Sequence, residues 1–430
     1  MDSIWTKTAQ KPRFDALDGD KKVDVLIVGG GIAGILCAYK LKNAGVDFIL
    51  IEADEICGGI TKNTTAKISI GHGLIYDKMI KRFGHDKARL YVEAQIKAGK
   101  EYAKLSKNID CDFENKDSYV YALYDSEKID KEVIALNRLG VKAHFYKTSS
   151  LPFPIAGAVV VKDQAQFDPL KFLYEIAKDL PIYEHTKAVE FMPYRIATNH
   201  GSISFKKLIV ATHFPIYNKH GLYPLKMYQH RSYVIALKGA ESLNGIYVDE
   251  SDTGLSFRNY GELLLLGGGG HRTGKTGGCW QELEEFAKKH YKDAAIVGRW
   301  ATQDCMTLDR LPYIGQYASN TQDVFVATGF NKWGMTNAMV AADILSDLVR
   351  EKHNRYANLF SPSRSILRPQ LALNAFESTV GLLIPTTPRC PHLGCALKYN
   401  RAEHTWDCPC HGSRFTLHGE LIDNPATDDL

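Results

Sequence analysis

A glycine-rich turn near the N-terminus limits the folds open to this chain more than any other feature. The apolar run Asp24–Val28 predicts a strand, and the helical spacing of apolar residues over Ile32–Leu41 predicts a helix. Between them, Gly29-Gly30-Gly31-Ile32-Ala33-Gly34 fits the pattern G-x-G-x-x-G. In that pattern the first glycine permits a tight turn, the second lets a pyrophosphate approach the backbone, and the third lets helix and strand pack closely. The helix N-terminus then offers N–H groups to phosphate.

A second strand and an acidic residue follow in the order that a dinucleotide site requires. Phe48–Ile51 is apolar and is followed directly by Glu52, eighteen residues after Gly34. An acidic side chain at that distance accepts hydrogen bonds from an adenosine ribose in dinucleotide-binding proteins. The glycines alone would also fit a purely structural turn. Strand, turn, helix, strand and acid together predict a dinucleotide site.

Three later segments extend this prediction. Ala53–Lys67 is rich in small and hydroxyl residues, which offer N–H and O–H donors to a phosphate or a ring. Lys207–Thr212 predicts a strand that returns to the same sheet. Val324–Ala327 predicts another strand, and Gly329–Thr336 leads from it into an apolar-periodic helix that ends near Arg350.

A nicotinamide site would need a second nucleotide motif. The other glycine cluster, Gly267–Gly274, satisfies G-x-G-x-x-G in no frame, and polar residues follow it where a helix should open. We therefore interpret it as a strand end and a loop, and we expect no nicotinamide site.

The C-terminus carries a second kind of signal. Four of the nine cysteines lie in the last 41 residues, and two of the histidines there, His392 and His411, stand close to them in the sequence. Cys390-Pro-His392 is followed by fifteen residues and then by Cys408-Pro-Cys410-His411, so each loop supplies one cysteine and one histidine. A zinc finger pairs cysteine with cysteine and histidine with histidine. In a Rieske [2Fe-2S] centre two cysteines hold one iron and two histidines hold the other. The spacing favours the Rieske centre, with Cys390, His392, Cys408 and His411 as ligands.

Composition excludes several classes of protein. The first twenty residues lack the apolar stretch of a secretory signal, and the longest low-charge run, Val25–Tyr39, is too short and too rich in glycine to span a bilayer. The 53 Lys and Arg against 49 Asp and Glu are spread along the chain, which disfavours nucleic acid as a partner. These features predict a cytoplasmic protein without a membrane span.

Residues 20–350 resemble the flavin amine-oxidase superfamily, which includes D-amino acid, glycine and sarcosine oxidases, through the segments above and Pro312-Tyr-Ile-Gly315. The resemblance implies FAD, with the adenine met by the backbone of Val189. It implies an α/β fold: an FAD-binding Rossmann-like βαβ domain, an inserted antiparallel-sheet substrate domain, and a small all-β Rieske lobe. The implied FAD-binding residues are Gly29, Gly31, Ile32, Ala33, Gly34, Glu52, Ala53, Gly59, Thr61, Thr65, Ala66, Val189, Ala211, Thr212, Asp309, Gly329, Phe330, Trp333, Gly334 and Thr336.

The same resemblance implies the domain boundaries. The FAD-dependent oxidoreductase would cover residues 1–365 and the Rieske domain residues 366–430. Within the oxidoreductase, the FAD-binding segments would be 20–75, 155–215 and 300–350. The substrate domain would comprise residues 76–154 and 216–299. We expect the short cluster lobe to lean on the oxidoreductase or on a second subunit, because so few residues build little core alone.

One departure from the superfamily concerns the substrate. Relatives that oxidise amino acids carry an arginine in a pattern like W-x-G-x-R-P-x-T-x-D-x-x-P-x-I-G, and this arginine pairs with the substrate carboxylate. Here Asp304 stands at that position. An acid favours a cation, so we predict an amine or polyamine substrate. Further pocket candidates are Tyr228, His230, Arg231, Tyr233 and Arg258. The sequence names no catalytic residue.

Two residues are nominally placed for the covalent flavin attachment that some relatives show. They are His72 and Cys305, and for both we favour a structural role. In the C-terminal lobe, the extra Cys395 and Cys410 resemble those of high-potential Rieske proteins of respiratory and photosynthetic complexes, which clamp their ligand loops with a disulfide. The resemblance implies a Cys395–Cys410 disulfide.

The whole chain resembles bacterial flavoproteins with a Rieske tail. A two-electron flavin beside a one-electron cluster predicts a dehydrogenase: an amine gives a hydride to FAD, and the cluster passes electrons singly to an external acceptor, a protein or a quinone. Two alternatives stay open. The chain could be an electron-transfer adaptor whose flavin is reduced by a partner, or a redox sensor.

Overall fold

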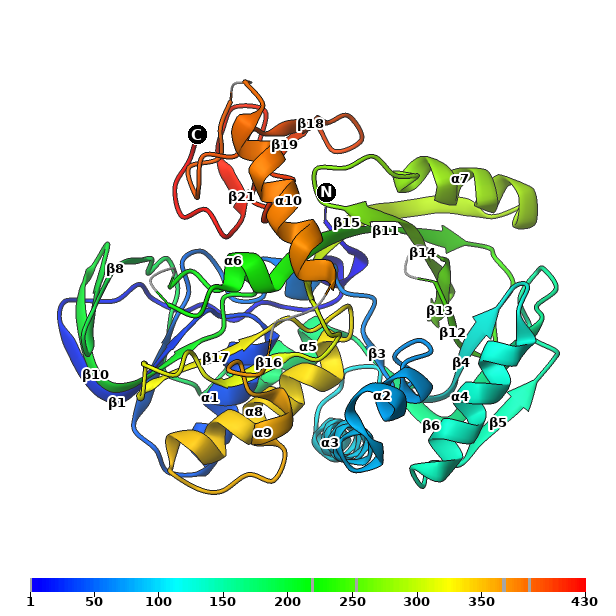
Figure 1. The fold of residues 1–430 in the computed structure, drawn as a ribbon, viewed down its shortest axis with the longest axis horizontal. Helices are drawn as coiled ribbons and strands as arrows, with labels where there is room; N and C mark the ends of the chain where they lie inside the picture. The colour runs from blue at the N-terminus through cyan, green and yellow to red at the C-terminus, as the bar shows by residue number, and fades with distance from the viewer. Residues whose placement is uncertain (1, 218–219, 252–253, 366–368, 386–387) are drawn as a thin grey trace.

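The glycine-rich turn follows a central strand of a parallel sheet. In this computed structural model, which describes residues 2–217, 220–251, 254–365, 369–385 and 388–430, strand β1 (Lys21–Val28) lies between β2 (Phe48–Ile51) and β10 (Gly201–Val210) and is parallel to both. Strand β17 (Val324–Thr328) adds in parallel to β10. The predicted return of the later segments to one sheet is confirmed (Figure 1).

This first sheet has eight strands and three covering helices. The remaining strands are β7 (Ile182–Tyr183), β8 (Ala188–Met192), β9 (Arg195–Thr198) and β16 (Tyr313–Gln316). The helices are α1 (Ile32–Asn43), α5 (Pro169–Ala177) and α8 (Gly334–Val349), of which α1 contacts both others. Helix α5 begins where it does because the Asp168 carboxylate accepts the Leu170 and Lys171 N–H groups and proline occupies the first helical position.

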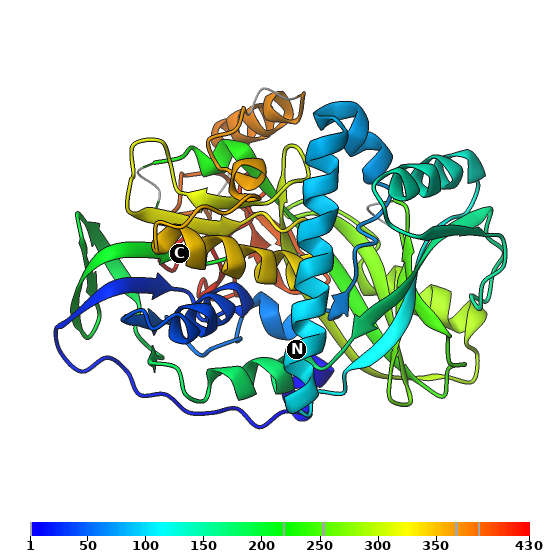
Figure 2. The same ribbon diagram turned by 90° about the horizontal axis from the view of Figure 1, so that it is seen from below.

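The second sheet has nine strands and is antiparallel except where β12 pairs with β4. Its order is β15 (Ala295–Thr307), β11 (Met227–Lys238), β14 (Leu263–Arg272), β13 (Ser256–Tyr260), β12 (Gly245–Asp249), β4 (Glu114–Ala122), β6 (Gly157–Gln166) and β3 (Lys67–Ile68), with β5 (Ala143–Tyr146) beside β6. Helix α7 (Cys279–His290) packs on β14 and β11, and α4 (Ser126–Arg138) packs on β5 and β6. Helices α2 (Tyr76–Phe83) and α3 (His85–Leu105) pack together, and the long helix α3 crosses α8 (Figure 2).

Three sequence predictions concern strands of this sheet. The boundaries at residues 155 and 300 assigned β6 and β15 to the FAD-binding segments, but both strands belong to the second sheet. Their apolar runs are buried in either sheet, so the pattern does not tell which sheet they join. The glycine cluster Gly267–Gly274 contains the end of β14 at Arg272 and the turn that follows it, which agrees with the predicted strand end and loop.

A small lobe caps the junction of the two sheets, above them in Figure 1. It contains a four-stranded antiparallel sheet of β18 (Lys398–Asn400), β19 (Thr405–Asp407), β20 (Arg414–Phe415) and β21 (Leu421–Asp423). The lobe is not all-β, because α10 (Pro369–Leu383) precedes the strands. The predicted boundary at 365/366 adjoins residues outside those that the structure describes.

The remaining elements are short. They are the helices α6 (Tyr223–Lys226) and α9 (Ala357–Phe360) and the 3-10 turns at Ile4–Lys7, Ile60–Asn63 and Ser106–Asn108. Within the described residues, no helix combines the length and the apolar character needed to cross a membrane.

Candidate functional site

A cavity of about 990 Å³ lies where the two sheets and the small lobe meet. The first sheet contributes the glycine turn after β1 and the residues after β10 and β17. The second sheet contributes side chains of β11, β13, β14 and β15. The small lobe contributes residues of its last strand and of the segment that follows it. Its size is at the upper end for small-molecule sites, which suits a long cofactor together with a substrate.

The glycine turn has the geometry that its motif predicts. Gly29 has φ +111°, and a Cβ there would lie 2.6 Å from the carbonyl oxygen of Ala211. A Cβ on Gly34 would lie 1.9 Å from the Gly29 carbonyl oxygen, so only glycine lets helix α1 pack on the turn. At Gly59 and Gly334, which line the cavity, a Cβ would meet nothing within 4 Å. These residues therefore form a cradle with room for a bound group.

Most of the residues that the resemblance assigned to FAD line this cavity. They are Gly29, Gly31, Ile32, Ala33, Glu52, Ala53, Gly59, Thr61, Thr65, Ala211, Thr212, Gly329, Phe330, Trp333 and Gly334. Gly34, Ala66 and Thr336 lie outside the lining; Ala66 and Thr336 are buried beside it, and Gly34 acts through packing. The Val189 side chain is 64% exposed, while its neighbour Ala188 lines the cavity.

Asp309, predicted to bind FAD, is not among the residues that line the cavity. Its carboxylate is paired with the Arg364 guanidinium, with one N–O distance of 2.7 Å, and also accepts the Leu311 N–H. Its side chain is 3% exposed and outside the cavity lining. The sequence motif contains an acid at this position, but the ion-pair partner of that acid is Arg364, 55 residues further along the chain. A local sequence motif cannot indicate such a distant partner.

Glu52 lies at the cavity edge and is held by the turn itself. Its carboxylate accepts the Gly30 N–H at 2.6 Å and the Asp54 N–H at 3.1 Å. Burial raises the pKa of Glu52, against the lowering effect of these backbone hydrogen bonds. The acid is thereby fixed in the orientation that a ribose hydroxyl at this edge would need.

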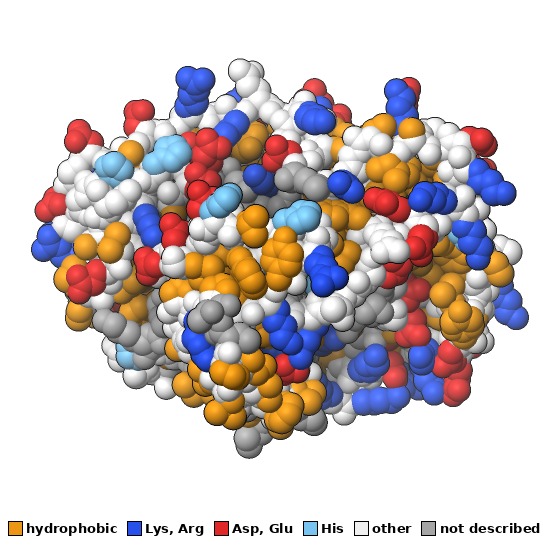
Figure 3. All heavy atoms as spheres, turned by 90° about the horizontal axis from the view of Figure 1, so that it is seen from above, with side chains coloured by type: hydrophobic (Ala, Val, Ile, Leu, Met, Phe, Trp, Pro, Cys, Tyr) orange, Lys and Arg blue, Asp and Glu red, His pale blue; other side chains and the backbone are white. Residues whose placement is uncertain are grey.

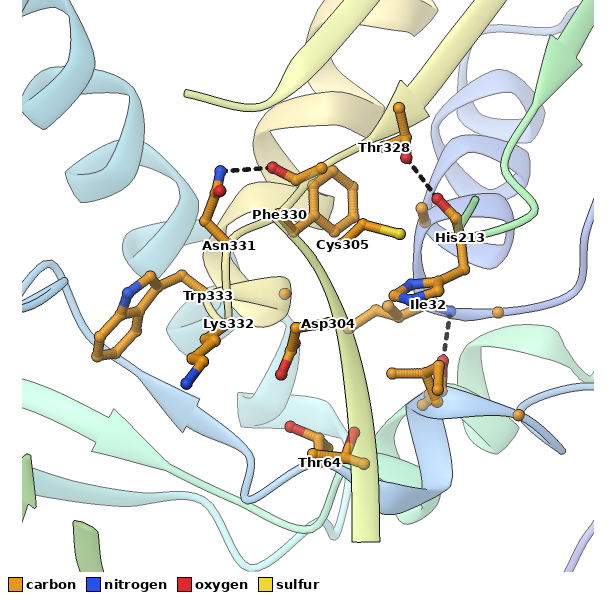
Figure 4. A pocket seen from close by; sticks show the side chains of 18 of the residues that line it. Ile32, Thr64, His213, Asp304, Cys305, Thr328, Phe330, Asn331, Lys332 and Trp333 are labelled. Atoms are coloured by element: carbon orange, nitrogen blue, oxygen red, sulfur yellow. Dashed lines mark hydrogen bonds between the residues drawn. The ribbon is translucent and has the colours of Figure 1, made fainter. Parts of the chain in front are cut away.

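Asp304 lines the cavity, as predicted. Burial raises its pKa to about 6, while the charges of Lys332 and Arg231 act in the opposite direction. Figure 4 shows the Asp304 and Lys332 side chains next to each other, with their polar ends pointing the same way into the pocket. An acid with a pKa near 6 that faces the cavity can bind an ammonium group and exchange a proton with it.

Of the other five substrate-pocket candidates, Tyr233 lines the cavity. Among the described residues, Tyr228, His230, Arg231 and Arg258 lie outside its lining. Arg258 is buried and donates to the backbone oxygens of Thr65 and Ala66, both at 2.8 Å. It therefore supports the cavity wall from behind. Strand alternation shows on which face of a sheet a side chain lies, but not whether that side chain faces a cavity or a buried partner. For this reason the sequence could not separate Tyr233 from the four candidates outside the lining.

The two candidates for covalent flavin attachment line the cavity. His72 is engaged at both ring nitrogens, with Tyr91 Oη at 2.7 Å and Thr336 Oγ1 at 3.1 Å, and it stacks on Trp333. Burial lowers its pKa to about 3 and raises that of Cys305 strongly. These contacts favour the structural role for His72.

Sequence reasoning named no role for several cavity residues that carry titratable groups, among them Lys332, His213 and Lys67. Lys332 follows strand β17, and His213 follows β10. Lys67 interacts with Thr65 Oγ1 and Ser256 Oγ, both at 3.1 Å, and burial together with the charge of Arg258 lowers its pKa to about 7. One signal was available: both Lys332 and His213 come directly after predicted strands, where ligands bind in parallel sheets.

The four predicted cluster ligands converge in the small lobe. The His392 and His411 rings lie 5.1 Å apart, and the thiols of Cys390 and Cys408 interact. Both nitrogens of His392 and Nδ1 of His411 are buried without a hydrogen-bond partner among the described residues. Burial lowers the pKa of His392 to about 4 and that of His411 to about 3, so both imidazoles are neutral. Neutral imidazoles with unused nitrogens fit metal ligation.

The other two cysteines of the lobe lie beside these ligands. The sulfur atoms of Cys395, Cys408 and Cys410 are all within 4.8 Å of one another. All nine cysteines are free thiols, so the structure does not contain the predicted Cys395–Cys410 disulfide. The two thiols are nevertheless close, and the disulfide stays a prediction for the oxidised protein.

The small lobe is firmly seated on the second sheet. Gln229 Nε2 and Gln303 Nε2 donate to the backbone oxygens of His411 and Gly412, both at 2.9 Å. The predicted pocket residue Arg231 instead forms an ion pair with Glu403 of the lobe. The lobe therefore leans on the oxidoreductase body of its own chain.

The fold and the two sites define a flavoprotein that carries an iron–sulfur lobe. Residues 24–348 match the family model of FAD dependent oxidoreductases, and residues 370–430 match that of the Rieske [2Fe-2S] domain. The chain therefore belongs to the FAD dependent oxidoreductase family and carries a Rieske domain, with FAD and a [2Fe-2S] cluster as cofactors.

Two curated relatives show how far the likeness extends. YhfW of Bacillus subtilis (strain 168), named as a Rieske 2Fe-2S iron-sulfur protein, is 35% identical over 100% of this chain and 97% of its own length. Gamma-glutamylputrescine oxidoreductase of Escherichia coli (strain K12) is 24% identical over 87% of this chain and 96% of its own.

Among solved structures, the fold is similar to that of glycine oxidase from Geobacillus kaustophilus, with a TM-score of 0.68 and 17% identity over 80% of this chain and 99% of that one. L-proline dehydrogenase from P. horikoshii gives a TM-score of 0.67, also at 17% identity, over 80% of this chain and 98% of that one. These similarities establish the fold.

Proposed function

We propose that this protein is a dehydrogenase that oxidises an amine-type substrate in the cavity and passes the electrons singly through the Rieske cluster to an external acceptor. Bound FAD accepts a hydride, and the cluster accepts one electron at a time. The glycine turn and the other cavity-lining residues would hold FAD. Cys390, His392, Cys408 and His411 would hold the cluster.

One observation carries this proposal. Six residues of the cluster lobe line the same cavity as the glycine turn: Leu421, Ile422, Asp423, Asn424, Ala426 and Thr427. The lobe is thus part of the wall of the flavin site. A cluster held at a fixed position beside the flavin is suited to draining it one electron at a time, which an oxidase that reduces oxygen directly does not need.

The charge of the cavity supports an amine. Asp304 occupies the position where amino-acid oxidising relatives carry an arginine, and its carboxylate would attract a substrate ammonium and repel a carboxylate. Lys332 lies beside Asp304 on this wall (Figure 4), whereas the Tyr233 hydroxyl is bound to His271 and Glu403. A similar protein, gamma-glutamylputrescine oxidoreductase, has a polyamine derivative in its name, which agrees with this substrate class.

Anaerobic screening tests the proposal. The purified protein is mixed without oxygen with mono-, di- and polyamines and, in parallel, with small α-amino acids, and flavin absorbance is followed. We expect bleaching by a member of the amine set. If no amine bleaches the flavin but a reduced partner protein does, the chain is an electron-transfer adaptor. Unchanged turnover with the natural acceptor after loss of the cluster would instead indicate a sensor.

Asp304→Asn tests the role of the acid. Removing a charged hydrogen-bond partner costs about 1.5–3 kcal/mol, so we expect the amine concentration for half-maximal bleaching to rise about tenfold or more at pH 8. In the unaltered protein the same concentration should rise as the pH falls through about 6, because Asp304 becomes protonated there. The variant should lack this pH dependence.

Asp249→Asn provides the matched control. Asp249 lines the same cavity, but its carboxylate accepts the Ser251 N–H at 2.8 Å. We expect little change in this variant. Tight binding of a small α-amino carboxylate, or an Asp304→Asn protein that bleaches with amines like the unaltered one, would contradict the assignment.

A further inference from the structure

Three consecutive residues connect the cavity with the cluster lobe. Thr212, His213 and Phe214 follow the carboxyl end of β10. Thr212 and His213 line the cavity, whereas Phe214 is fully buried in an apolar cluster that includes Met227 and Cys305. The backbone thus leads from the cavity wall into the interior beneath the lobe.

At its inner end this segment meets a cluster ligand. The Phe214 ring lies against the His392 ring, with 6.5 Å between the centroids and 74° between the planes, an edge-on arrangement. His392 in turn lies 5.1 Å from His411, the second histidine ligand. The contact between segment and cluster site is therefore made by packed aromatic rings.

Asn424 of the lobe fastens the segment from the other side. Its Nδ2 donates to the backbone oxygen of Thr212 at 2.5 Å and to that of Phe214 at 2.8 Å. Gln229 Nε2 donates to the backbone carbonyl oxygens of Asn424 and His411, each at 2.9 Å. Asn424 and Gln229 thus connect the segment to the backbone of His411, while the Phe214 ring contacts His392.

At the cavity end of the segment, His213 is fixed by a hydrogen bond and carries no charge. The His213 carbonyl accepts a hydrogen bond from Thr328 Oγ1 (Figure 4), and the ring nitrogen Nε2 is buried. Burial lowers the pKa of His213 to about 4, although Asp423 and Gln229 favour the charged form, so the imidazole is neutral at physiological pH. The segment between the cavity and the cluster ligands therefore contributes no charge of its own.

We propose that Thr212–Phe214 is the route by which electrons pass from FAD to the Rieske cluster, and that Asn424 is the positioning residue that keeps the route in contact with the lobe. The proposal rests on the proposed function. In each event one electron leaves the reduced flavin and reduces the oxidised cluster, which then reduces the external one-electron acceptor. Two events return the flavin to its oxidised form, and a proton is released to water. No bond between heavier atoms forms or breaks.

Phe214→Leu tests the route, because leucine keeps the site apolar but removes the ring that faces His392. The flavin is reduced by light and an anaerobic photoreductant, and the cluster is followed by its absorbance and by electron paramagnetic resonance. No amine is needed, so failure of amine oxidation and failure of this route are distinguishable. We expect cluster reduction to be several-fold slower than in the unaltered protein.

Phe205→Leu is the matched control. Phe205 lies on β10 in the same apolar cluster and undergoes the same substitution. We expect an unchanged rate. The midpoint potential of the cluster is measured in each protein, and rates are compared at equal driving force. A Phe214→Leu rate equal to that of the unaltered protein under this comparison would overturn the route.

Asn424→Ser provides a second variant should Phe214→Leu fail to assemble its cluster. Serine is too short to reach both carbonyl groups, and we expect slower cluster reduction with normal FAD content. In the unaltered protein, the one-electron-reduced flavin should relax faster in pulsed paramagnetic resonance when the cluster is reduced. Equal relaxation with the cluster oxidised and reduced would show that the two sites are not adjacent, which also overturns the route.

Discussion

Alanine in place of His411 is expected to remove the Rieske cluster and leave the FAD in place. His411 is one of two histidines available to one iron, and its Nδ1 is buried with no hydrogen-bond partner in the described part of the chain. His411 does not line the flavin cavity, so FAD binding has no direct dependence on it. We expect loss of the iron and of the Rieske paramagnetic resonance signal, normal flavin content, and amine-dependent flavin bleaching without electron delivery to a one-electron acceptor.

His418→Ala is the control for this variant. His418 belongs to the same lobe but is exposed, and we expect full cluster content after its replacement. A His411→Ala protein with an undiminished Rieske signal would refute the ligand assignment. Zinc in place of iron in the unaltered protein would refute the cluster itself, since the alternative for a cysteine and histidine site of this size is a zinc centre.

Arg414→Met is expected to have the largest effect on stability. The Arg414 guanidinium contacts three carboxylates, those of Glu403 at 2.7 Å, Asp407 at 3.1 Å and Asp423 at 2.9 Å. All of these side chains are buried or nearly so. Removing the cation leaves Asp407 without a cationic partner among the described residues, and leaves Glu403 and Asp423 with Arg231 alone. Uncompensated buried charge of this kind costs about 3–5 kcal/mol. Because Glu403 also pairs with Arg231 of the second sheet, we expect the lobe to loosen as well.

Denaturant unfolding measures this effect, with cluster absorbance reporting on the lobe and flavin fluorescence on the body. Lys398→Met, at an exposed lysine of the same lobe, is the control and should change stability little. Burial opposes ionisation of Glu403, but Arg231 and Arg414 hold its pKa below the usual value. The ionised Glu403 carboxylate therefore stabilises the folded protein at neutral pH, and this stabilisation is lost as the pH falls through that lowered pKa. The destabilisation by Arg414→Met should shrink in acid; a loss of stability that is constant with pH would contradict the ionic account.

The parts of the site that follow from local motifs could be predicted from the sequence. The glycine turn, Glu52 and the cluster ligands lie at fixed spacings because each is built from one or two short segments. Asp304 could be picked out because it replaces the arginine of a short sequence motif that amino-acid oxidising relatives share. The residues that the prediction misplaced depend on distant partners. Arg231 looked like a pocket cation, but its partner Glu403 is 172 residues away.

The relation between the two redox sites could not be predicted for the same reason. Phe214 and Asn424 belong to no motif, and 210 residues separate them. Neither residue stands out in the sequence, and the contact between them forms only when the lobe packs on the second sheet.

Some apolar side chains of the lobe remain exposed, which no sequence motif indicates. Figure 3 views this face of the molecule, on which hydrophobic side chains gather; Leu373, Phe376 and Leu393 of the lobe are among the exposed ones.

If the proposed function is correct, electrons taken from the substrate must reach the cluster. An amine that bleaches the flavin is mixed with the protein without oxygen, and samples frozen at successive times are examined by electron paramagnetic resonance. We predict that the signal of the reduced Rieske cluster grows as the flavin bleaches, before any external acceptor is added. A flavin that bleaches completely while the cluster stays oxidised, despite a cluster potential above that of the flavin, would contradict the proposed function.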